Sequence, residues 1–221
     1  NEFERPVWTT SSGVALSTEV DQIHRNSDYL IVTYPTQLYR DSNDDPSVDR
    51  LLSSMAELAL HRNGILGYIK MSADYDVETI KGYIRAWGNH MRGVDGVEGR
   101  YLSNGGYLLL VGETEIIPSF TVSFTGDPCN KVNDVHWSDM PYGDMSGDQS
   151  PELSVGRIIG DTPAEMILPI RGSINVVKGE PGFEFFRDRA FLMSGGGDGA
   201  DSFAQNVDEI KDIIDDYFSS I

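Results

Sequence analysis

The chain has 221 residues, of which 17 are basic and 35 acidic, so its formal net charge is −18. Such a surface repels nucleic acid and anionic membranes and attracts cations. No apolar run reaches the roughly 18 residues of a membrane-spanning helix. Cys129 is the only cysteine, which excludes a disulfide framework and a multi-cysteine zinc site.

The first 70 residues predict one strand–helix–strand unit after a lead-in. Residues 1–28 show no clear period and are expected to be extended. Residues 29–35 (YLIVTYP) are an apolar run that ends at a proline, which is typical of a buried strand. Helical spacing follows from Asp45–Ser47, with Pro46 in the first turn, to Gly64. Residues 65–71 (ILGYIKM) predict a second strand.

The same alternation continues and then breaks. A helix is predicted from about Asp76, and residues 106–112 (GYLLLVG) predict a third, fully apolar strand. Residues 113–151 are rich in Pro, Gly, Asp and Ser, and they contain one short alternating strand, SFTVSF, at 119–124. This middle stretch is therefore expected to be mostly irregular.

The rhythm returns toward the carboxyl end. Residues 153–158 (LSVGRI) predict a strand, and a helix is expected from about Thr162 to Lys178. A linker (GEPG, 179–182) precedes a predicted strand at 189–194 and a helix from about Asp201 to Phe218.

Strands that alternate with helices indicate right-handed βαβ units and a mostly parallel sheet with helices on both faces. The expected fold class is therefore a three-layer α/β fold. Three parts are expected: a lead-in at 1–28, an α/β subdomain at 29–178, and a linker with the start of a second subdomain at 179–221.

A glycine-rich turn, SGGGDGADS at 194–202, lies between a predicted strand and a predicted helix. Phosphate-binding loops occupy this place in α/β folds, but the glycines here do not fit GxGxxG, and Asp198 and Asp201 would repel phosphate. Two interpretations stay open. Asp201 is the N-cap of the helix in a flexible turn, or the turn lies at the ligand-binding edge of the sheet and its acids bind a cationic side chain.

A cysteine–histidine pair is the second candidate. Cys129 and His136 are seven residues apart, and such a pair can act as a nucleophile and its base. Their spacing in an irregular stretch does not fix their geometry. The other histidines, His24, His61 and His90, have the character of surface or helix-end residues.

An acidic turn is the third candidate. Oxygen-bearing side chains fall at every second position from 144 to 152: Asp144, Ser146, Asp148, Ser150 and Glu152. Calcium loops place oxygens in this way, because the ion takes six to eight oxygen ligands. The match is partial, since Gly147 falls one place early and the loop is shorter than an EF-hand loop. The alternatives are a calcium site formed by Asp144, Ser146, Asp148 and Glu152, and a plain acidic turn before the next strand.

Three segments together resemble the gingipain-type cysteine peptidases, which belong to the caspase-like clan. They are YLLLVGETEIIP (Tyr107–Pro118), SDMPYGD (Ser138–Asp144) and ELSVGRI (Glu152–Ile158), in the order and approximate spacing of that family. The resemblance covers residues 29–221 and implies a caspase-like fold. Glu113 stands where the family usually has aspartate. Cys129 and His136 match no catalytic motif of the family.

The resemblance also implies site residues. In arginine-specific members, an aspartate just before a helix of the second subdomain meets the basic P1 side chain of the substrate. Asp201 falls at the matching place, and Asp198 is the second choice. The catalytic histidine and cysteine are expected downstream of Ile221. The chain does not begin with Met, and we expect an excised or processed piece.

The predicted function is therefore the amino-terminal part of a gingipain-like cysteine endopeptidase, inactive by itself. Its expected partners are a peptide or protein substrate, with a basic P1 residue, and the downstream catalytic subdomain of the same protein. Neither nucleic acid nor a membrane span is expected, and the expected location is secreted or at the cell surface. The alternative is a non-catalytic extracellular module that binds calcium or a cationic partner; a phosphate-binding Rossmann-like domain is third.

Overall fold

The structure, a computed structural model, describes residues 26–70, 76–88, 91, 105–123 and 135–182. The chain divides into two compact units, 1–178 and 179–221, and the fold below is that of the first unit. Residues 1–25 of the predicted lead-in, the strand at 189–194, the glycine-rich turn and the helix after Asp201 lie outside the described residues.

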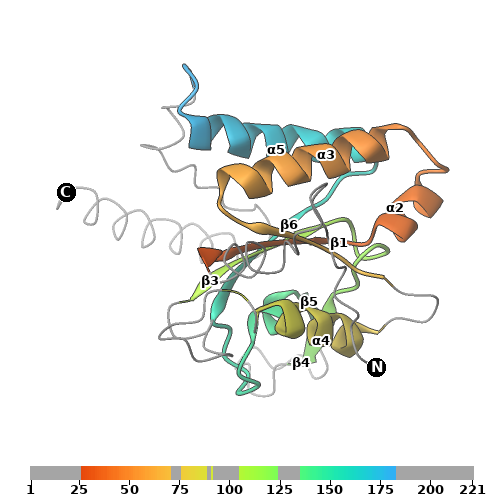
Figure 1. The fold of residues 1–221 in the computed structure, drawn as a ribbon. Helices are drawn as coiled ribbons and strands as arrows, with labels where there is room; N and C mark the ends of the chain where they lie inside the picture. Colours follow the sequence, from red (N-terminus) through yellow and green to blue (C-terminus); the bar gives the residue numbers. More distant parts are fainter. Residues whose placement is uncertain (1–25, 71–75, 89–90, 92–104, 124–134, 183–221) are drawn as a thin grey trace, which may run out of the picture. The chain divides into compact units, whose positions relative to one another are not determined.

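Four parallel strands form the central sheet (Figure 1). In chain order they are β1 (Tyr29–Thr33), β2 (Ile65–Tyr68), β3 (Gly106–Val111) and β6 (Leu153–Ile158). Their order across the sheet is β2-β1-β3-β6, with Leu30 beside Ile65 in β2 and Leu108 in β3. All four strands coincide with predicted strands, although β2 ends at Tyr68 and not at Met71.

Helices cover both faces of this sheet. Helices α3 (Ser47–His61) and α5 (Pro163–Lys178) pack together on one face, and α4 (Val77–Gly88) lies on the other (Figure 1). An antiparallel pair, β4 (Phe120–Ser123) and β5 (Val135–Ser138), lies on the side of α4. The prediction of a three-layer α/β fold is confirmed, and the arrangement is consistent with a caspase-like fold.

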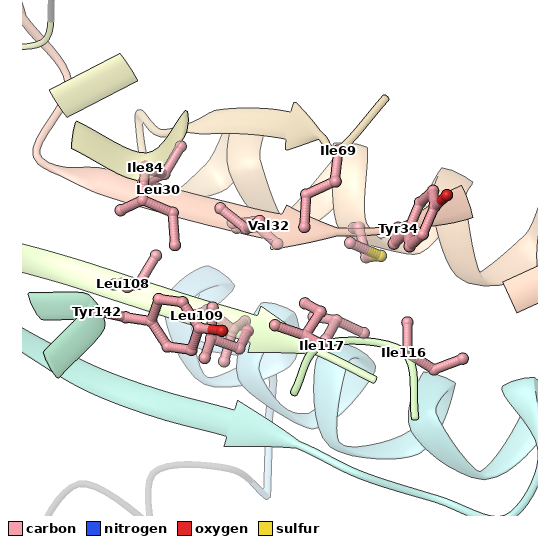
Figure 2. Packing of buried hydrophobic residues seen from close by; sticks show 14 of the residues in the cluster. Leu30, Val32, Tyr34, Ile69, Ile84, Leu108, Leu109, Ile116, Ile117 and Tyr142 are labelled. Atoms are coloured by element: carbon pink, nitrogen blue, oxygen red, sulfur yellow. The ribbon is translucent and has the colours of Figure 1, made fainter. Parts of the chain in front are cut away.

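Burial on both faces of the sheet explains why the strand sequences are continuous apolar runs. Leu30, Ile31 and Val32 point to alternate faces of β1, yet all three are at most 1% exposed. A strand covered on both faces has no solvent side, so it needs no polar alternation. Figure 2 shows Leu30 and Val32 in the buried cluster with Ile84 from α4. Burying each such side chain contributes about 1.5–3 kcal/mol.

Helices α3 and α4 begin close to the predicted positions, Asp45–Ser47 and Asp76. The Asp45 carboxylate accepts a hydrogen bond from Ser47 N at 2.7 Å, and the Asp76 carboxylate accepts one from Thr79 N at 2.7 Å. The end of α3 differs from the prediction. The residue in the left-handed backbone conformation that ends the helix is Asn63, with φ of 51°. Gly64 has a different role: it leaves room for β1, because a Cβ at this position would lie 2.6 Å from the Tyr29 carbonyl oxygen.

Three short elements escaped the sequence analysis: α2 (Pro35–Asp41), β5, and a 3-10 helix at Met140–Gly143. The sequence pattern indicates Pro35 as a strand end, but this proline is the first residue of α2, a position that it suits because its missing N–H has no partner there anyway. Among the described helices, none has the length and apolar character that a bilayer crossing requires.

Candidate functional site

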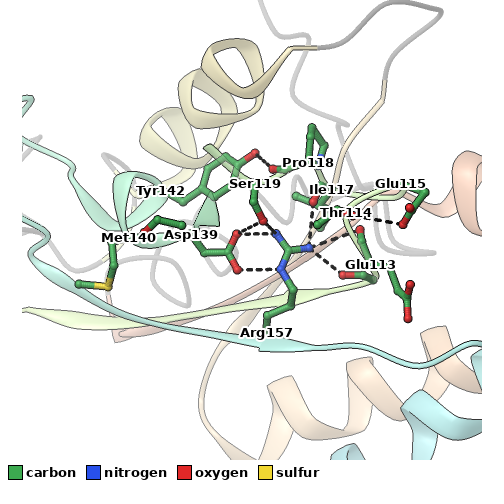
Figure 3. Close-up of polar contacts among 12 residues, drawn as sticks. Glu113, Thr114, Glu115, Ile117, Pro118, Ser119, Asp139, Met140, Tyr142 and Arg157 are labelled. Atoms are coloured by element: carbon green, nitrogen blue, oxygen red, sulfur yellow. Dashed lines mark hydrogen bonds and ion pairs between the residues drawn. The ribbon is translucent and has the colours of Figure 1, made fainter. Parts of the chain in front are cut away.

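The three motif segments meet at the side chain of Arg157, which lies in β6 (Figure 3). Its Nε and Nη2 donate to the two carboxylate oxygens of Asp139, each at 2.7 Å. Its Nη1 donates to the carbonyl oxygens of Gly112 at 2.8 Å and Ile117 at 2.9 Å. Arg157 therefore ties the turn after β5 and the loop after β3 to β6.

This ion pair is largely desolvated, since the side chains of Arg157 and Asp139 are 11% and 23% exposed. Burial raises the pKa of Asp139, but hydrogen bonds from Arg157 and Ser119 and the charge of Arg157 outweigh it, so the pKa lies below its ordinary value. The planar fork of arginine suits this arrangement, because it binds a carboxylate with two parallel bonds and still has donors for carbonyl groups.

The loop after β3 has two further anchors. Gly112 has φ of +129°, and a Cβ there would lie 2.6 Å from the side chain of Ile116, so the glycine of the VGE segment is required by its backbone and by its neighbour. Tyr142 is fully buried, and its hydroxyl donates to the carbonyl oxygen of Pro118. The three motif segments are thus joined by one network of contacts, which positions residues 112–119.

A second buried ion pair links α4 to the acidic turn. Lys81 Nζ lies 2.9 Å from Asp144 Oδ2, and the two side chains are 10% and 5% exposed. Arg85, one helical turn further along α4, donates Nε and Nη2 to the Asp144 carbonyl oxygen, each at 3.1 Å. Burial raises the pKa of Asp144, but the bonds from Lys81 and from Gly147 N and the two positive charges outweigh it and lower the pKa.

The acidic turn brings three of the four predicted calcium ligands together. Asp144, Asp148 and Glu152 each offer a carboxylate oxygen, and these oxygens lie within 4.8 Å of one another. The fourth predicted ligand, Ser146, accepts a hydrogen bond on its hydroxyl from Asp148 N at 3.3 Å. Gly147, with φ of +88°, takes a left-handed backbone conformation in this turn. The cluster could hold a metal ion.

The fit to calcium is partial. Asp144 already faces Lys81 and Arg85, and Glu152 Oε2 accepts hydrogen bonds from Met145 N at 2.8 Å and Ser146 N at 3.4 Å. Calcium takes six to eight oxygens, so three carboxylates would need added backbone or water oxygens. Asp148 is the exposed member of the three and offers the most accessible oxygen.

The other predicted site residues are placed as follows. Asp198, Asp201 and Cys129 lie outside the described residues, as do His24 and His90. His136 lies in β5, in register with Val122 of β4, but the description does not extend to its side chain. His61 lies in the last turn of α3, with Nε2 3.9 Å from Glu57 Oε1. The geometry of the Cys129–His136 pair is therefore untested.

Sequence reasoning missed the basic partners of Asp144. Lys81 and Arg85 are separated by four residues, so they lie on one face of α4, and Lys81 directly follows the buried Ile80. A lysine beside the apolar stripe of an amphipathic helix signals a buried or partly buried charge that needs a partner. The sequence contains this pattern, so a partner for Lys81 could have been expected, but the pattern does not identify Asp144 as that partner.

Comparison with protein families identifies a relationship over most of the chain. The model of peptidase family C25 matches residues 23–220. Neither the curated proteins nor the solved structures gave a significant match. The matched span includes the whole described sheet, the Arg157 network and the acidic turn. The chain therefore belongs to peptidase family C25, the gingipain family of cysteine peptidases.

Proposed function

We propose that this chain is the amino-terminal part of a gingipain-like cysteine endopeptidase, in which residues 26–178 form a non-catalytic scaffold. The family implies a cysteine peptidase that acts on proteins. The observation that supports the scaffold role is that the motif residues bond to one another and to backbone groups. Arg157 binds Asp139 and the Ile117 carbonyl oxygen, and Tyr142 binds the Pro118 carbonyl oxygen. None of these three side chains is placed as a nucleophile or a general base.

The chemistry of the whole enzyme needs a thiolate, a histidine that transfers protons, and backbone N–H groups that bind the oxyanion. The part of the chain that the structure describes contains no cysteine. Its one histidine with a described side chain, His61, lies beside Glu57 on α3. We therefore assign the dyad to residues downstream in the same protein, as the family resemblance implies.

The test is a peptidase assay on the purified 221-residue chain with basic, acidic and apolar peptide substrates. The expected result is no turnover, with and without reductant. Turnover that is lost in a Cys129→Ala variant would contradict the proposal and make Cys129 the nucleophile. The protein extended past Ile221 provides the positive control, because the proposal expects it to cleave peptides.

Substrate selection by Asp201, with Asp198 as the second choice, is part of the same proposal. Asp201→Asn separates the two roles of this residue, because asparagine caps a helix about as well as aspartate but carries no charge. In the full-length enzyme, the variant should keep its melting temperature and lose activity on arginine substrates relative to apolar ones. Unchanged activity on arginine substrates would leave Asp201 as a helix cap alone.

Calcium binding at the acidic turn is a second proposed property, favoured by the three converging carboxylates. Asp148 and Glu152 would hold the ion with Asp144 and would tie the turn together when it is bound. A ligand that binds only the folded state raises stability by about 2.7 kcal/mol at a hundredfold excess over its dissociation constant. Melting temperatures in calcium and in chelator should therefore differ for the wild type and differ less for Asp148→Ala. Equal calcium responses in both proteins would remove this turn from consideration.

The alternative, a peptidase-like module without catalysis that binds calcium or a cationic partner, predicts the same scaffold. The extended protein separates the two, since only the enzyme would cleave peptides.

We further propose that the protein is secreted or displayed at the cell surface, and its detection in culture medium or in a surface fraction tests this.

A further inference from the structure

An asparagine–glycine pair lies in the connection between α3 and β2. Asn63 and Gly64 come after His61, the last residue of α3, and before Ile65, the first residue of β2. Asparagine deamidates most readily when glycine follows it, because glycine has no Cβ to hinder the attack of its backbone nitrogen on the asparagine side chain. The pair therefore has a chemical reactivity that the sites described above do not use.

The reaction needs no partner other than water. The backbone nitrogen of Gly64 attacks Cγ of Asn63, the new C–N bond closes a succinimide ring, and the bond from Cγ to Nδ2 breaks. The proton of the attacking nitrogen leaves with the Nδ2 group as ammonia. Water then opens the ring at either carbonyl carbon. The product is aspartate or isoaspartate, and in isoaspartate the backbone continues through the side-chain carboxyl group.

Both reacting nitrogens are engaged in hydrogen bonds in the folded chain. Gly64 N donates to the Ala59 carbonyl oxygen at 2.7 Å, and Asn63 N donates to that of Leu60 at 3.3 Å, which is the Schellman pattern at the end of a helix. Asn63 Nδ2 donates to the Asn26 carbonyl oxygen at 3.1 Å. The attacking nitrogen and the leaving group are thus each held away from the reaction.

The reaction therefore follows local opening of the end of α3. Asn63 has a left-handed backbone with φ of 51°, and ring closure requires rotation of its side chain and of its Cα–carbonyl bond. These rotations break the bonds to Asn26 and Ala59. Local openings cost between about zero and the full free energy of unfolding. Water reaches the site without hindrance, because Asn63 is exposed.

Neither product fits the place that asparagine occupies. In aspartate, a carboxylate oxygen replaces the Nδ2 donor, so a repulsion between two oxygens replaces the hydrogen bond to Asn26. The new charge also lies at the carboxyl end of a helix, which disfavours anions. Isoaspartate adds a backbone carbon directly before the paired strand β2. There is little room for this change, since even a Cβ on Gly64 would lie 2.6 Å from the Tyr29 carbonyl oxygen.

We propose that Asn63 is a deamidation site whose rate is set by opening of the end of α3, and that its conversion weakens the connection between α3 and β2. The product lacks the bonds that slow its own formation, so a modified chain opens at this place more often than an unmodified one. The proposal concerns a spontaneous reaction of this chain and does not depend on peptidase activity.

The first test compares deamidation of the 221-residue chain in mildly alkaline buffer with and without unfolding urea. Peptide mapping by mass spectrometry follows the conversion of amide to acid, and chromatography separates aspartate from isoaspartate peptides. The other asparagine–glycine pair, Asn104–Gly105, is the reference for the unfolded rate in urea. Asn63 should react at least about tenfold more slowly without urea, which corresponds to an opening cost of about 1.4 kcal/mol. Equal rates in the two conditions would overturn the proposal.

A pair of variants tests whether the opening is local. Ala59→Gly weakens α3 at the residue whose carbonyl oxygen binds Gly64 N, so it should speed deamidation of Asn63 about twofold to fivefold. Ala86→Gly removes the same methyl group inside α4 and should leave the rate at Asn63 unchanged. Equal acceleration by both variants would assign the reaction to unfolding of the whole unit and would overturn the local mechanism.

The last test measures the effect of the product on stability. The deamidated chain carries an additional negative charge, so anion exchange separates it from the unmodified chain. The isoaspartate form should melt at a lower temperature than the unmodified chain. Asn63→Asp, which adds the charge without lengthening the backbone, should melt between the two. Equal melting temperatures of the isoaspartate form and the unmodified chain would contradict the proposed weakening.

Discussion

Arg157 and Asp139 form a bidentate ion pair, with both N–O distances at 2.7 Å, and the same guanidinium binds two carbonyl oxygens of the loop after β3. Residues that are far apart in sequence thus depend on one side chain. Because the pair is mostly buried, removing Arg157 leaves the Asp139 charge and two carbonyl groups without their bonds.

The first prediction concerns Arg157. Arg157→Met should lower the free energy of unfolding by about 3–5 kcal/mol, the range for breaking a buried ion pair. Arg157→Lys should be intermediate, because it keeps the charge but loses the fork geometry. Urea denaturation measures both. Arg50→Lys, at an exposed position of α3, is the control and should change stability by less than about 0.5 kcal/mol. Equal stability of Arg157→Lys and the wild type would show that the fork geometry is not needed.

The second prediction is a double-mutant cycle across Lys81 and Asp144. Lys81→Met should cost about 3–5 kcal/mol, because it leaves the buried Asp144 carboxylate without its closest cation. The double variant Lys81→Met/Asp144→Asn should cost less than the sum of the two single changes, since no buried charge is left unpaired. Additive costs would mean that the two side chains do not interact appreciably in solution.

Two glycines should respond to alanine with opposite signs. Gly112→Ala places a Cβ 2.6 Å from Ile116 at a φ of +129°, so it should destabilise by more than about 1 kcal/mol. Gly172 lies inside α5, where an added Cβ would meet nothing within 4 Å, so Gly172→Ala should stabilise by about 0.5–1 kcal/mol. Thermal unfolding of both variants checks the pair, and a stabilising Gly112→Ala would contradict the described loop.

Stability should fall in acid. The pKa values of Asp139 and Asp144 are lowered in the folded state, so the unfolded chain binds more protons between the folded pKa and the ordinary value of about 3.9. The stabilisation is complete above that value and is lost as the pH falls through the folded pKa. Asp144→Asn should make the dependence of unfolding free energy on pH shallower below about pH 4. An unchanged slope would mean that Asp144 is not stabilised as its anion.

The sequence predicted those parts of the fold that follow from local patterns. The apolar runs in β1, β3 and β6 predict buried parallel strands because both sheet faces are covered, and Asp45 and Asp76 predict helix starts because their carboxylates bind local N–H groups. The strand β5 and helix α2 were missed. Each is short, and whether it forms a strand or a helix depends on packing and pairing with segments elsewhere in the chain.

The site was predicted in part for the same reason. The carboxylates of Asp144, Asp148 and Glu152 are near in sequence, so their convergence followed from spacing. The contact of Lys81 with Asp144 joins residues 63 positions apart, and no local pattern specifies such a pair. The role of Arg157 was also hidden, because a family resemblance shows that a residue recurs in a motif but not what its side chain contacts.

The Arg157 network also affects how the chain between Ser119 and Asp139 can vary in length. Ser119 Oγ donates to Asp139 Oδ1 at 2.7 Å, and both residues contact the same guanidinium. The two ends of this stretch are therefore pinned together whatever lies between them. Because loop-closure entropy grows only slowly with length, each doubling costs about 0.6 kcal/mol. A longer connection between β4 and β5 should therefore cost the folded chain little stability, because the Arg157 network already joins Ser119 to Asp139.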